Sequence, residues 1–382
     1  MKIALISWDR GMVAGCELHV RDLEGGLPKR GHEVVSIRLN PTERRAGERP
    51  LSAQIAGALD GVDVAYFHGA TDAYDLETFD RLPVLVATHD HGLTCVRPHR
   101  YLPLSIEPCH RPPGLACLQH GCIVVRNRQP SARLPVELRS PFRLRNRLKR
   151  LGARAPIAAC SRYVRDNLVN AGLPPHRAHV VHPIPPEQKR PLKRRPEARA
   201  LLFVGSLLRG KGVDIAIDAL ATLPADITLT VIGDGPSRAS LERRARALVP
   251  GRVRFEGQAN GRAVVDAYDR ASVVVVPSRW PEPFGMVGLE AMRRARPVVA
   301  ANHGGIPEWA AGTAGARLFT PGDPKSLARG VLGLLEDPDA GGAALQHAQD
   351  KFPHARLFGE LEALLGSVVG EAASAGRPSS RA

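Results

Sequence analysis

The chain has 382 residues, which is long enough for two domains of ordinary size, and 43% of them are hydrophobic, which supports a buried core. Aromatic residues make up only 4%, while 37 glycines and 33 prolines are typical of a loop-rich α/β protein. The net charge of +15 fits nucleic acid, an anionic membrane surface or acidic small molecules as a partner. The basic runs lack interleaved aromatic residues, and no zinc-finger or RNP-type pattern occurs, so we expect no nucleic-acid partner.

The N-terminal residues and the cysteine content indicate where such a protein would work. The first apolar run ends at Asp9, which is too early for a signal peptide and typical of a first strand. No uninterrupted apolar stretch reaches the length that crosses a bilayer. Six cysteines in a chain of this length are not a disulfide framework. We expect a cytoplasmic protein, either soluble or peripherally attached at the membrane surface.

Strand-like and helix-like segments alternate along the first half of the chain. The strands are expected at residues 2–7, 31–38, 62–67, 83–88, 155–160 and 179–182. A helical pattern fills residues 17–30, where Gly25, Gly26 and Pro28 predict a break. Ser161 is expected to cap a later helix. This alternation predicts right-handed βαβ units and a doubly wound parallel sheet.

Two of the expected strand ends carry candidate binding residues, because ligands of parallel sheets bind at the carboxyl ends of the strands. Residues 9–15 form a glycine-containing loop that ends at Gly15, although it is not a Gly-x-Gly-x-x-Gly fingerprint. His89 follows the fourth strand. Its side chain can donate a hydrogen bond to a sugar hydroxyl, or it can simply fix the loop.

A proline-rich stretch at residues 95–122 has neither helical nor strand periodicity. It contains four of the six cysteines, namely Cys95, Cys109, Cys117 and Cys122. Tetrahedral zinc bound to the thiolates would explain how so long a loop holds its shape. No Cys-x-x-Cys spacing is present, so free thiols in an acceptor-binding loop are the alternative.

Residues 139–154 form a short basic amphipathic helix. Basic charge beside an apolar face suits docking to anionic lipid. The same pattern also fits a surface helix whose apolar stripe packs on its own domain. The first domain then ends at residue 182, and residues 183–199, which are rich in proline and positive charge, are the expected linker.

The second domain opens with a strand that starts at residue 200 and runs into a glycine-containing loop. Residues 205–211 fit the start of a P-loop, but Gly212 stands where a P-loop needs serine or threonine to hold magnesium. We therefore reject a P-loop. Lys211 remains at the mouth of the strand, where it can neutralise a diphosphate as a point charge.

Strand and helix patterns continue through the rest of this domain. Further strands are expected within residues 227–236, 252–258 and 297–308, and helices at 327–335 and 358–369. Between them, four consecutive valines at residues 273–276 predict a strand buried on both faces.

A loop and a helix that starts near Phe284 follow the valine strand. The backbone amides of Phe284, Gly285 and Met286 should therefore be unpaired at a helix N-terminus, which suits a phosphate or a sugar hydroxyl. Glu282 and Glu290 frame this site. Taken singly, the first could only complement the helix dipole, and the second could belong to a solvated helix face.

The segment Glu-Pro-Phe-Gly-x4-Glu-Ala-Met at residues 282–292 resembles the retaining GT-B glycosyltransferases of family 4. In that family Glu282 would hydrogen-bond the donor sugar, and Glu290 would hold the ribose hydroxyls. Phe284, Gly285 and Met286 would offer backbone amides to the sugar and phosphate. His89 would lie beside the donor sugar.

The resemblance also implies roles for the loop that follows residue 204. Family members usually have Gly-Arg-Leu-x3-Lys-Gly there, with both basic residues on the diphosphate. Lys211 matches, Ser206 replaces the arginine, and Arg209 is the candidate to take its place. Of the glycine pair that the family carries in its first loop, only Gly15 is present.

The resemblance further implies a GT-B fold of two Rossmann-like doubly wound domains that face a central cleft. The expected division is an acceptor-side domain at 1–182, the linker, a nucleotide-sugar domain at 200–345, a helix at 346–370 that returns to the first domain, and a disordered tail at 371–382.

The expected activity is transfer of a sugar from a nucleotide-diphosphate sugar to an acceptor hydroxyl with retention of anomeric configuration. No metal cofactor is expected in that reaction, and a UDP-sugar is the expected donor because it is the commonest in the family. The acceptor would be a small molecule, a glycan or a lipid-linked molecule. The alternatives are a catalytically silent nucleotide-sugar-binding partner, suggested by Ser206, and a sugar-nucleotide epimerase of the same fold.

Overall fold

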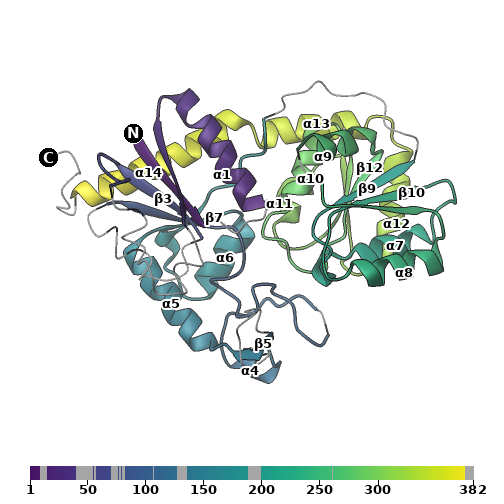
Figure 1. Ribbon diagram of the computed structural model, residues 1–382, viewed down its shortest axis with the longest axis horizontal. Helices are drawn as coiled ribbons and strands as arrows, with labels where there is room; N and C mark the ends of the chain where they lie inside the picture. Colours follow the sequence, from purple (N-terminus) through teal and green to yellow (C-terminus); the bar gives the residue numbers. More distant parts are fainter. Residues whose placement is uncertain are drawn as a thin grey trace. The chain divides into compact units, whose positions relative to one another are not determined.

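The computed structural model of the protein describes residues 1–8, 15–39, 55, 57–69, 76, 79, 82–105, 107–126, 136–187, 199–259 and 261–374. The chain divides into two units, each built around its own parallel sheet (Figure 1). The first unit contains Met1–Ser105, Cys109–Pro186 and His354–Ala382, and the second contains Ile106–Pro108 and Glu187–Pro353. Most of the expected linker, residues 188–198, lies outside the described residues.

The first unit contains a six-stranded parallel sheet in the order β2-β1-β3-β4-β7-β8. Its strands are β1 (Lys2–Trp8), β2 (Glu33–Leu39), β3 (Val64–His68), β4 (Val84–Thr88), β7 (Ile157–Ala159) and β8 (Ala178–Val180). Strands β3 and β4 are buried along their whole length, because helices cover both faces of such a sheet. The strand order reverses between β1 and β3, so the carboxyl ends of these two strands form the topological switch point.

Helices and short 3-10 turns connect and cover these strands. They are α1 (Gly15–Gly26), η1 (Pro28–Arg30), α4 (Leu115–Gln119), α5 (Pro141–Arg154), α6 (Arg162–Asn170), η3 (Pro175–Arg177) and α14 (His354–Ser374). The expected break after α1 is confirmed, since the helix ends at Gly26 and η1 starts at Pro28. The Ser161 cap is also confirmed, because its hydroxyl accepts a hydrogen bond from the Val164 amide at 3.1 Å.

The second unit repeats the scheme with the strand order β11-β10-β9-β12-β13-β14, again entirely parallel. The strands are β9 (Ala200–Val204), β10 (Thr228–Ile232), β11 (Val253–Gly257), β12 (Val273–Val276), β13 (Val298–Ala301) and β14 (Ala316–Phe319). The four valines of β12 are all buried, as predicted. The switch point lies between β9 and β12, so the loops that follow these strands meet at one place.

The helices of the second unit include three, α7, α8 and α9, for which no helix was predicted. The elements are η4 (Arg209–Lys211), α7 (Val213–Leu220), α8 (Arg238–Leu248), α9 (Gly261–Arg270), α10 (Met286–Arg293), α11 (Ile306–Ala310), α12 (Pro324–Leu335) and α13 (Ala340–Lys351). Among the described helices, none combines the length and the apolar character that a membrane-crossing helix needs.

The C-terminal part departs from the prediction of a single helix at 346–370. Two helices occur instead: α13 ends at Lys351 in the second unit, and α14 starts at His354 in the first. Pro353 lies between them, and proline cannot donate the backbone hydrogen bond that a continuous helix needs. Helix α14 also extends through residues 371–374, which we expected to belong to the tail, and residues 375–382 lie outside the described residues.

Helix α14 is fastened to the N-terminal part of the first unit. The Glu362 carboxylate accepts two hydrogen bonds from Arg30, at 2.6 and 2.7 Å. The Phe358 ring lies against Gly26, where a Cβ atom would approach the ring to 2.0 Å. Only glycine therefore permits this approach of α14 to the end of α1.

A similar close approach in the second unit generates a prediction about stability. A Cβ atom on Gly288 in α10 would lie 2.0 Å from the buried Trp309 ring of α11. We expect Gly288→Ala to lower the free energy of unfolding by about 1–3 kcal/mol through overpacking. Urea denaturation would measure the change.

Gly333 in α12 provides the matched control, because nothing lies within 4 Å of its added Cβ atom. Gly333→Ala should leave the free energy of unfolding unchanged or raise it by about 0.5–1 kcal/mol. Equal stability of the two variants would contradict this account of α10 packing.

Candidate active site

The switch point of the second sheet brings together Lys211, which follows β9, and Glu282, which follows β12. Lys211 Nζ lies 2.7 Å from Glu282 Oε1, although the two residues are 71 positions apart in the chain. The Lys211 ammonium also lies 4.9 Å from the centre of the Trp280 ring, within the range of a cation–π interaction. The structure thus joins two of the residues that the sequence singled out.

The Glu282 carboxylate is buried but well supplied with hydrogen-bond donors. Besides Lys211, the Ser278 hydroxyl and Trp280 Nε1 donate to Oε1, at 2.5 and 2.7 Å. Burial alone would raise the pKa of Glu282, but the charge of Lys211 and these three hydrogen bonds outweigh it and hold the pKa below its ordinary value. Glu282 is therefore ionised near neutral pH, and all the hydrogen bonds to its carboxylate described in this structure use one oxygen.

Glycines without room for a side chain hold these two loops together. Gly212 has a φ of +70°, and a Cβ atom there would lie 1.9 Å from the Pro277 carbonyl oxygen. A Cβ atom on Gly304 would lie 2.4 Å from the Glu282 carbonyl oxygen, and the Gly305 amide donates to that same oxygen at 2.8 Å. The loop that follows β13 therefore holds the Glu282 backbone in place through this hydrogen bond and the close contact at Gly304.

The start of α10 presents backbone amides beside Glu282. Gly285 adopts a left-handed conformation with φ of +86° and precedes the first helical residue, Met286. Among the described residues, neither of these two amides has a hydrogen-bond acceptor. The Phe284 side chain is buried and packs against Phe352 with ring centres 5.7 Å apart, and its carbonyl oxygen accepts a hydrogen bond from Trp309 Nε1 at 2.7 Å.

Glu290 lies inside α10 and pairs with a tyrosine that the sequence analysis did not identify. Tyr268 in α9 donates its hydroxyl to Glu290 Oε2 at 3.0 Å. Burial raises the pKa of Glu290, and the hydrogen bond from Tyr268 opposes this shift without cancelling it. The carboxyl group is thus oriented by a buried phenol.

Ser206 and Arg209 lie between β9 and α7 with exposed side chains. Arg209 has no ion-pair partner among the described residues, so its guanidinium remains available to an anion. Neither residue contacts the Lys211–Glu282 pair in the interactions that the structure describes.

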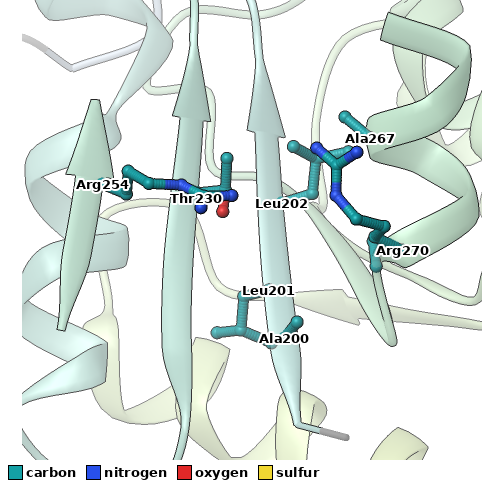
Figure 2. A pocket seen from close by; sticks show the side chains of 8 residues that line it. Ala200, Leu201, Leu202, Thr230, Arg254, Ala267 and Arg270 are labelled. Atoms are coloured by element: carbon teal, nitrogen blue, oxygen red, sulfur yellow. The ribbon is translucent and has the colours of Figure 1, made fainter. Parts of the chain in front are cut away.

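A small pocket on the second sheet is separate from this site (Figure 2). It is lined by Ala200, Leu201, Leu202, Thr230, Arg254, Ala267, Arg270 and Ala271. Three of these residues open β9, whereas Lys211 follows the opposite, carboxyl end of that strand. Ligands of parallel sheets bind at the carboxyl ends, so we do not assign this pocket to the candidate site.

His89 belongs to the first unit, where it forms a cluster with two histidines that the sequence analysis missed. His68 is the last residue of β3, and its Nδ1 lies 2.9 Å from His89 Nε2. His19 lies on α1, and one ring nitrogen from each of the three lies within 4.8 Å of the others. The position of His68 at the end of a parallel strand was a usable signal, but only the folded chain shows that α1 brings His19 to it.

Geometry alone would allow these three histidines to hold a metal ion, but their hydrogen bonds favour another arrangement. The Ile184 amide donates to His19 Nδ1 at 3.3 Å, which assigns the proton of this ring to Nε2 and makes that nitrogen a donor. Burial, followed by the charge of His89, lowers the pKa of His19 and of His68 well below the ordinary value. Both rings are therefore neutral near pH 7, and His68 is hydrogen-bonded to His89.

Gly15 is the first residue of α1, as expected for the end of the N-terminal loop. Residues 9–14 of that loop lie outside the described residues.

The zinc site expected at Cys95, Cys109, Cys117 and Cys122 is not supported. Among the described residues, which include all four, no three of these sulfur atoms lie within 4.8 Å of one another. Cys122 packs instead into an apolar cluster with Val96 and Leu144. The Cys122 side chain thus packs as an apolar group between segments that are distant in the sequence. The stretch also contains α4, which is too short for its period to show in the sequence.

Comparison with known proteins supports the family resemblance for part of the chain. Residues 185–351 match the family model described as Glycosyl transferases group 1. D-inositol 3-phosphate glycosyltransferase 2 of Catenulispora acidiphila is 36% identical over 171 residues, which is 40% of this chain and 40% of that protein. Glycogen synthase of Mycobacterium tuberculosis is 37% identical over 144 residues, which is 37% of this chain and 34% of that protein. The chain thus spans two fifths or less of the length of these curated relatives.

Solved structures resemble nearly the whole chain. HepE of Anabaena, solved with UDP and glucose, has a TM-score of 0.69 at 20% identity and matches 96% of this chain and all of that one. Sucrose-phosphate synthase of Thermosynechococcus elongatus has a TM-score of 0.62 at 19% identity, over 96% of this chain and 99% of that one. These similarities show the fold: two Rossmann-like α/β units, as in GT-B glycosyltransferases.

The two buried histidines generate a prediction about pH. Because their folded pKa values lie below the ordinary value, the unfolded chain takes up protons below about pH 6.5 that the folded chain does not. The free energy of unfolding should therefore be unaffected by them above that pH and fall by up to about 1.4 kcal/mol per pH unit for each histidine below it. Urea denaturation of His68→Asn should show a shallower acid dependence than that of the wild type.

The exposed His176 provides the control, because His176→Asn should keep the wild-type acid dependence. A His68→Asn variant with an unchanged slope would disprove the neutral, buried state of this ring.

Cys122 generates a prediction about thiol reactivity. Burial and the charges of the neighbouring cysteines raise the pKa of its thiol to about 11. Since the thiolate is the reactive form, we expect alkylation of Cys122 by iodoacetamide to be slow at neutral pH and to accelerate up to about pH 11. Peptide mass spectrometry after timed labelling would measure the rate. A stoichiometric zinc ion in the purified protein would contradict the free-thiol state.

Proposed function

We propose that the protein is a retaining glycosyltransferase of family 4 that moves a hexosyl group from a nucleotide-diphosphate sugar to an acceptor hydroxyl. The observation that carries this proposal is the Lys211–Glu282 pair at the switch point of the second sheet, inside the matched residues 185–351. A switch point is where α/β sheets of this kind bind nucleotides.

The charges around the pair suit a sugar diphosphate. Lys211 keeps about a quarter of its side chain exposed, so its ammonium can meet an anion without leaving Glu282. The amides of Gly285 and Met286 add the positive end of a helix dipole. Together these groups would bind the diphosphate, and Arg209 would supply the second basic contact.

Glu282 and Glu290 are then the acceptors for hydroxyl groups of the donor. The Glu282 carboxylate is ionised and fixed through one oxygen, so the other can accept a hydrogen bond from the sugar. Glu290 is oriented by Tyr268 and would hold the ribose. A pair of carboxyl groups held in this way discriminates strongly against ligands that lack the matching hydroxyls.

The mechanism that we propose is electrostatic. The diphosphate gains negative charge as the glycosidic bond breaks, and a fixed ammonium and fixed amides stabilise that charge without reorganising. Glu282 is a weak nucleophile in this setting, because three donors and a lowered pKa stabilise its carboxylate. It would therefore orient the sugar, while the acceptor attacks from the face that the leaving group occupies.

A UDP-sugar is the donor that we propose. HepE, which is similar in fold, has been solved in complexes with UDP and with UDP-glucose. The competing proposal is a nucleotide-sugar-binding partner without catalytic activity, which is suggested by Ser206 in the place where the resemblance implies an arginine. Tight binding of UDP-glucose with no turnover under any acceptor would favour this competing proposal.

The ion pair generates a prediction about binding and turnover. Lys211→Met should weaken UDP binding, measured by titration calorimetry, by about 10–100-fold, because a charge-assisted hydrogen bond to phosphate is lost. Release of UDP from UDP-glucose should slow by about 100-fold or more. Lys325→Met in α12 removes an exposed lysine and should change neither quantity.

A double variant separates chemistry from folding. Lys211→Met alone leaves the Glu282 charge buried and unpaired, which can destabilise the loop. Lys211→Met combined with Glu282→Gln removes both charges and should restore thermal stability without restoring turnover. Wild-type turnover in the double variant would rule out the proposed role of the pair.

A further inference from the structure

Most of the net positive charge of the chain comes from one segment, which belongs to the first unit except for residues 106–108. Residues 97–154 contain thirteen basic side chains and two acidic ones, so they carry a net charge of +11 out of the total of +15. The described parts of this segment, residues 97–105, 107–126 and 136–154, are called the basic lobe below. They include α4, the two-stranded ribbon of β5 (Val124–Arg126) and β6 (Val136–Leu138), and α5 (Figure 1).

The basic lobe also carries most of the exposed apolar side chains. Of the ten large hydrophobic residues exposed in the described part of the chain, seven lie between residues 104 and 142. They are Leu104, Leu115, Leu118, Val124, Val136, Leu138 and Phe142. Leu104 is 91% exposed and Leu138 is 75% exposed, so these side chains are held in water and not merely at the edge of a core.

The ribbon register places three of these side chains on one face. Val124 pairs with Leu138 and Arg126 pairs with Val136 in an antiparallel ladder. Paired residues share a face, and so do residues two apart in a strand, so Val124, Val136 and Leu138 lie on the same side. Three of the four positions on that side of the ribbon are apolar, and the fourth is Arg126.

Helix α4 presents a second apolar surface. Leu115 and Leu118 are three residues apart, which puts them on the same side of the helix, and they are 67% and 44% exposed. The segments around α4 and the ribbon are joined to α5 by the cluster of Val96, Cys122 and Leu144, against which Cys117 packs.

Helix α5 contributes charge and not an apolar face. Its apolar stripe of Leu144, Leu148 and Leu151 is buried, which supports the packed-helix interpretation of this segment. Six basic residues and no acidic residue lie on the helix, and Arg143 and Lys149 are exposed. Basic charge and exposed aliphatic groups thus come from neighbouring elements of one lobe.

We propose that the basic lobe docks on the surface of an anionic phospholipid bilayer. The aliphatic side chains of α4 and the ribbon enter the headgroup region, while the arginines of α5 meet lipid phosphates. This combination fits a bilayer better than nucleic acid, because six of the seven exposed apolar side chains are aliphatic and cannot stack on bases as aromatic rings do. The inference does not depend on the proposed activity.

Sedimentation with vesicles tests this proposal on the full-length protein. Vesicles of phosphatidylcholine alone are compared with vesicles of phosphatidylcholine and phosphatidylglycerol in equal parts. We expect the protein to bind the anionic vesicles at least about tenfold more tightly and to release them as salt is added. Failure of the wild-type protein to sediment with anionic vesicles would overturn the proposal.

Two pairs of variants assign the binding to the basic lobe. Leu115→Glu with Leu138→Glu removes apolar contacts, and Leu248→Glu at a similarly exposed leucine of α8 is its control. Arg143→Gln with Lys149→Gln removes two charges, and Arg243→Gln with Arg246→Gln on α8 removes two exposed charges elsewhere. Each lobe variant should lose about tenfold or more in vesicle affinity, and the α8 variants should bind as the wild type does.

Three further readouts make the outcome unambiguous. Circular dichroism and calorimetric binding of UDP should match the wild type in every variant that folds, so a loss of vesicle binding is not a loss of structure or of the proposed nucleotide site. Equal losses in lobe and α8 variants would overturn the assignment to the lobe. Tight, lobe-dependent binding of a duplex or single-stranded oligonucleotide without vesicle binding would identify nucleic acid as the partner.

Discussion

The second unit is organised around a buried carboxylate that stays charged. Taking Glu282 out of water is costly, and the cost is offset only because an ammonium, an indole and a hydroxyl all donate to one of its oxygens. Those donors come from two loops that meet because the strand order reverses between β9 and β12. The glycines at 212 and 304 let the backbones approach closely enough for this arrangement. Removing any one of the three donors would leave the buried charge with fewer partners.

The same arrangement sets the charge that a ligand would meet. The Lys211 ammonium is paired with Glu282, but its side chain is partly exposed. An anion could therefore contact both this ammonium and the backbone amides at the start of α10. A site of this kind is pre-oriented, so an incoming diphosphate would replace water and not existing structure. Glu290 and Tyr268 extend the site along α10 with a second oriented carboxyl group.

The first unit uses buried polar groups and surface charge in different ways. His19 and His68 are neutral because they are buried, and they hold the ring of His89 through short contacts at the carboxyl end of a sheet. The basic lobe instead keeps its charge in water, beside aliphatic groups that no other described element covers. The net charge of +15 therefore reflects mainly residues 97–154 and not the nucleotide-sugar site that we propose for the second unit.

The sequence by itself determined the two parallel sheets and singled out three candidate site residues, Lys211, Glu282 and Glu290, because strand and helix periods and motif spacing are local properties of the chain. Only the tertiary structure decided which side chains surround them. Ser278 and Tyr268 carry no pattern of their own, and their bonds to the two glutamates depend on how loops and helices pack. The grouping of four cysteines in one long loop suggested a metal, because the sequence records only that these thiols are near one another in the chain. Distances between the side chains follow from packing.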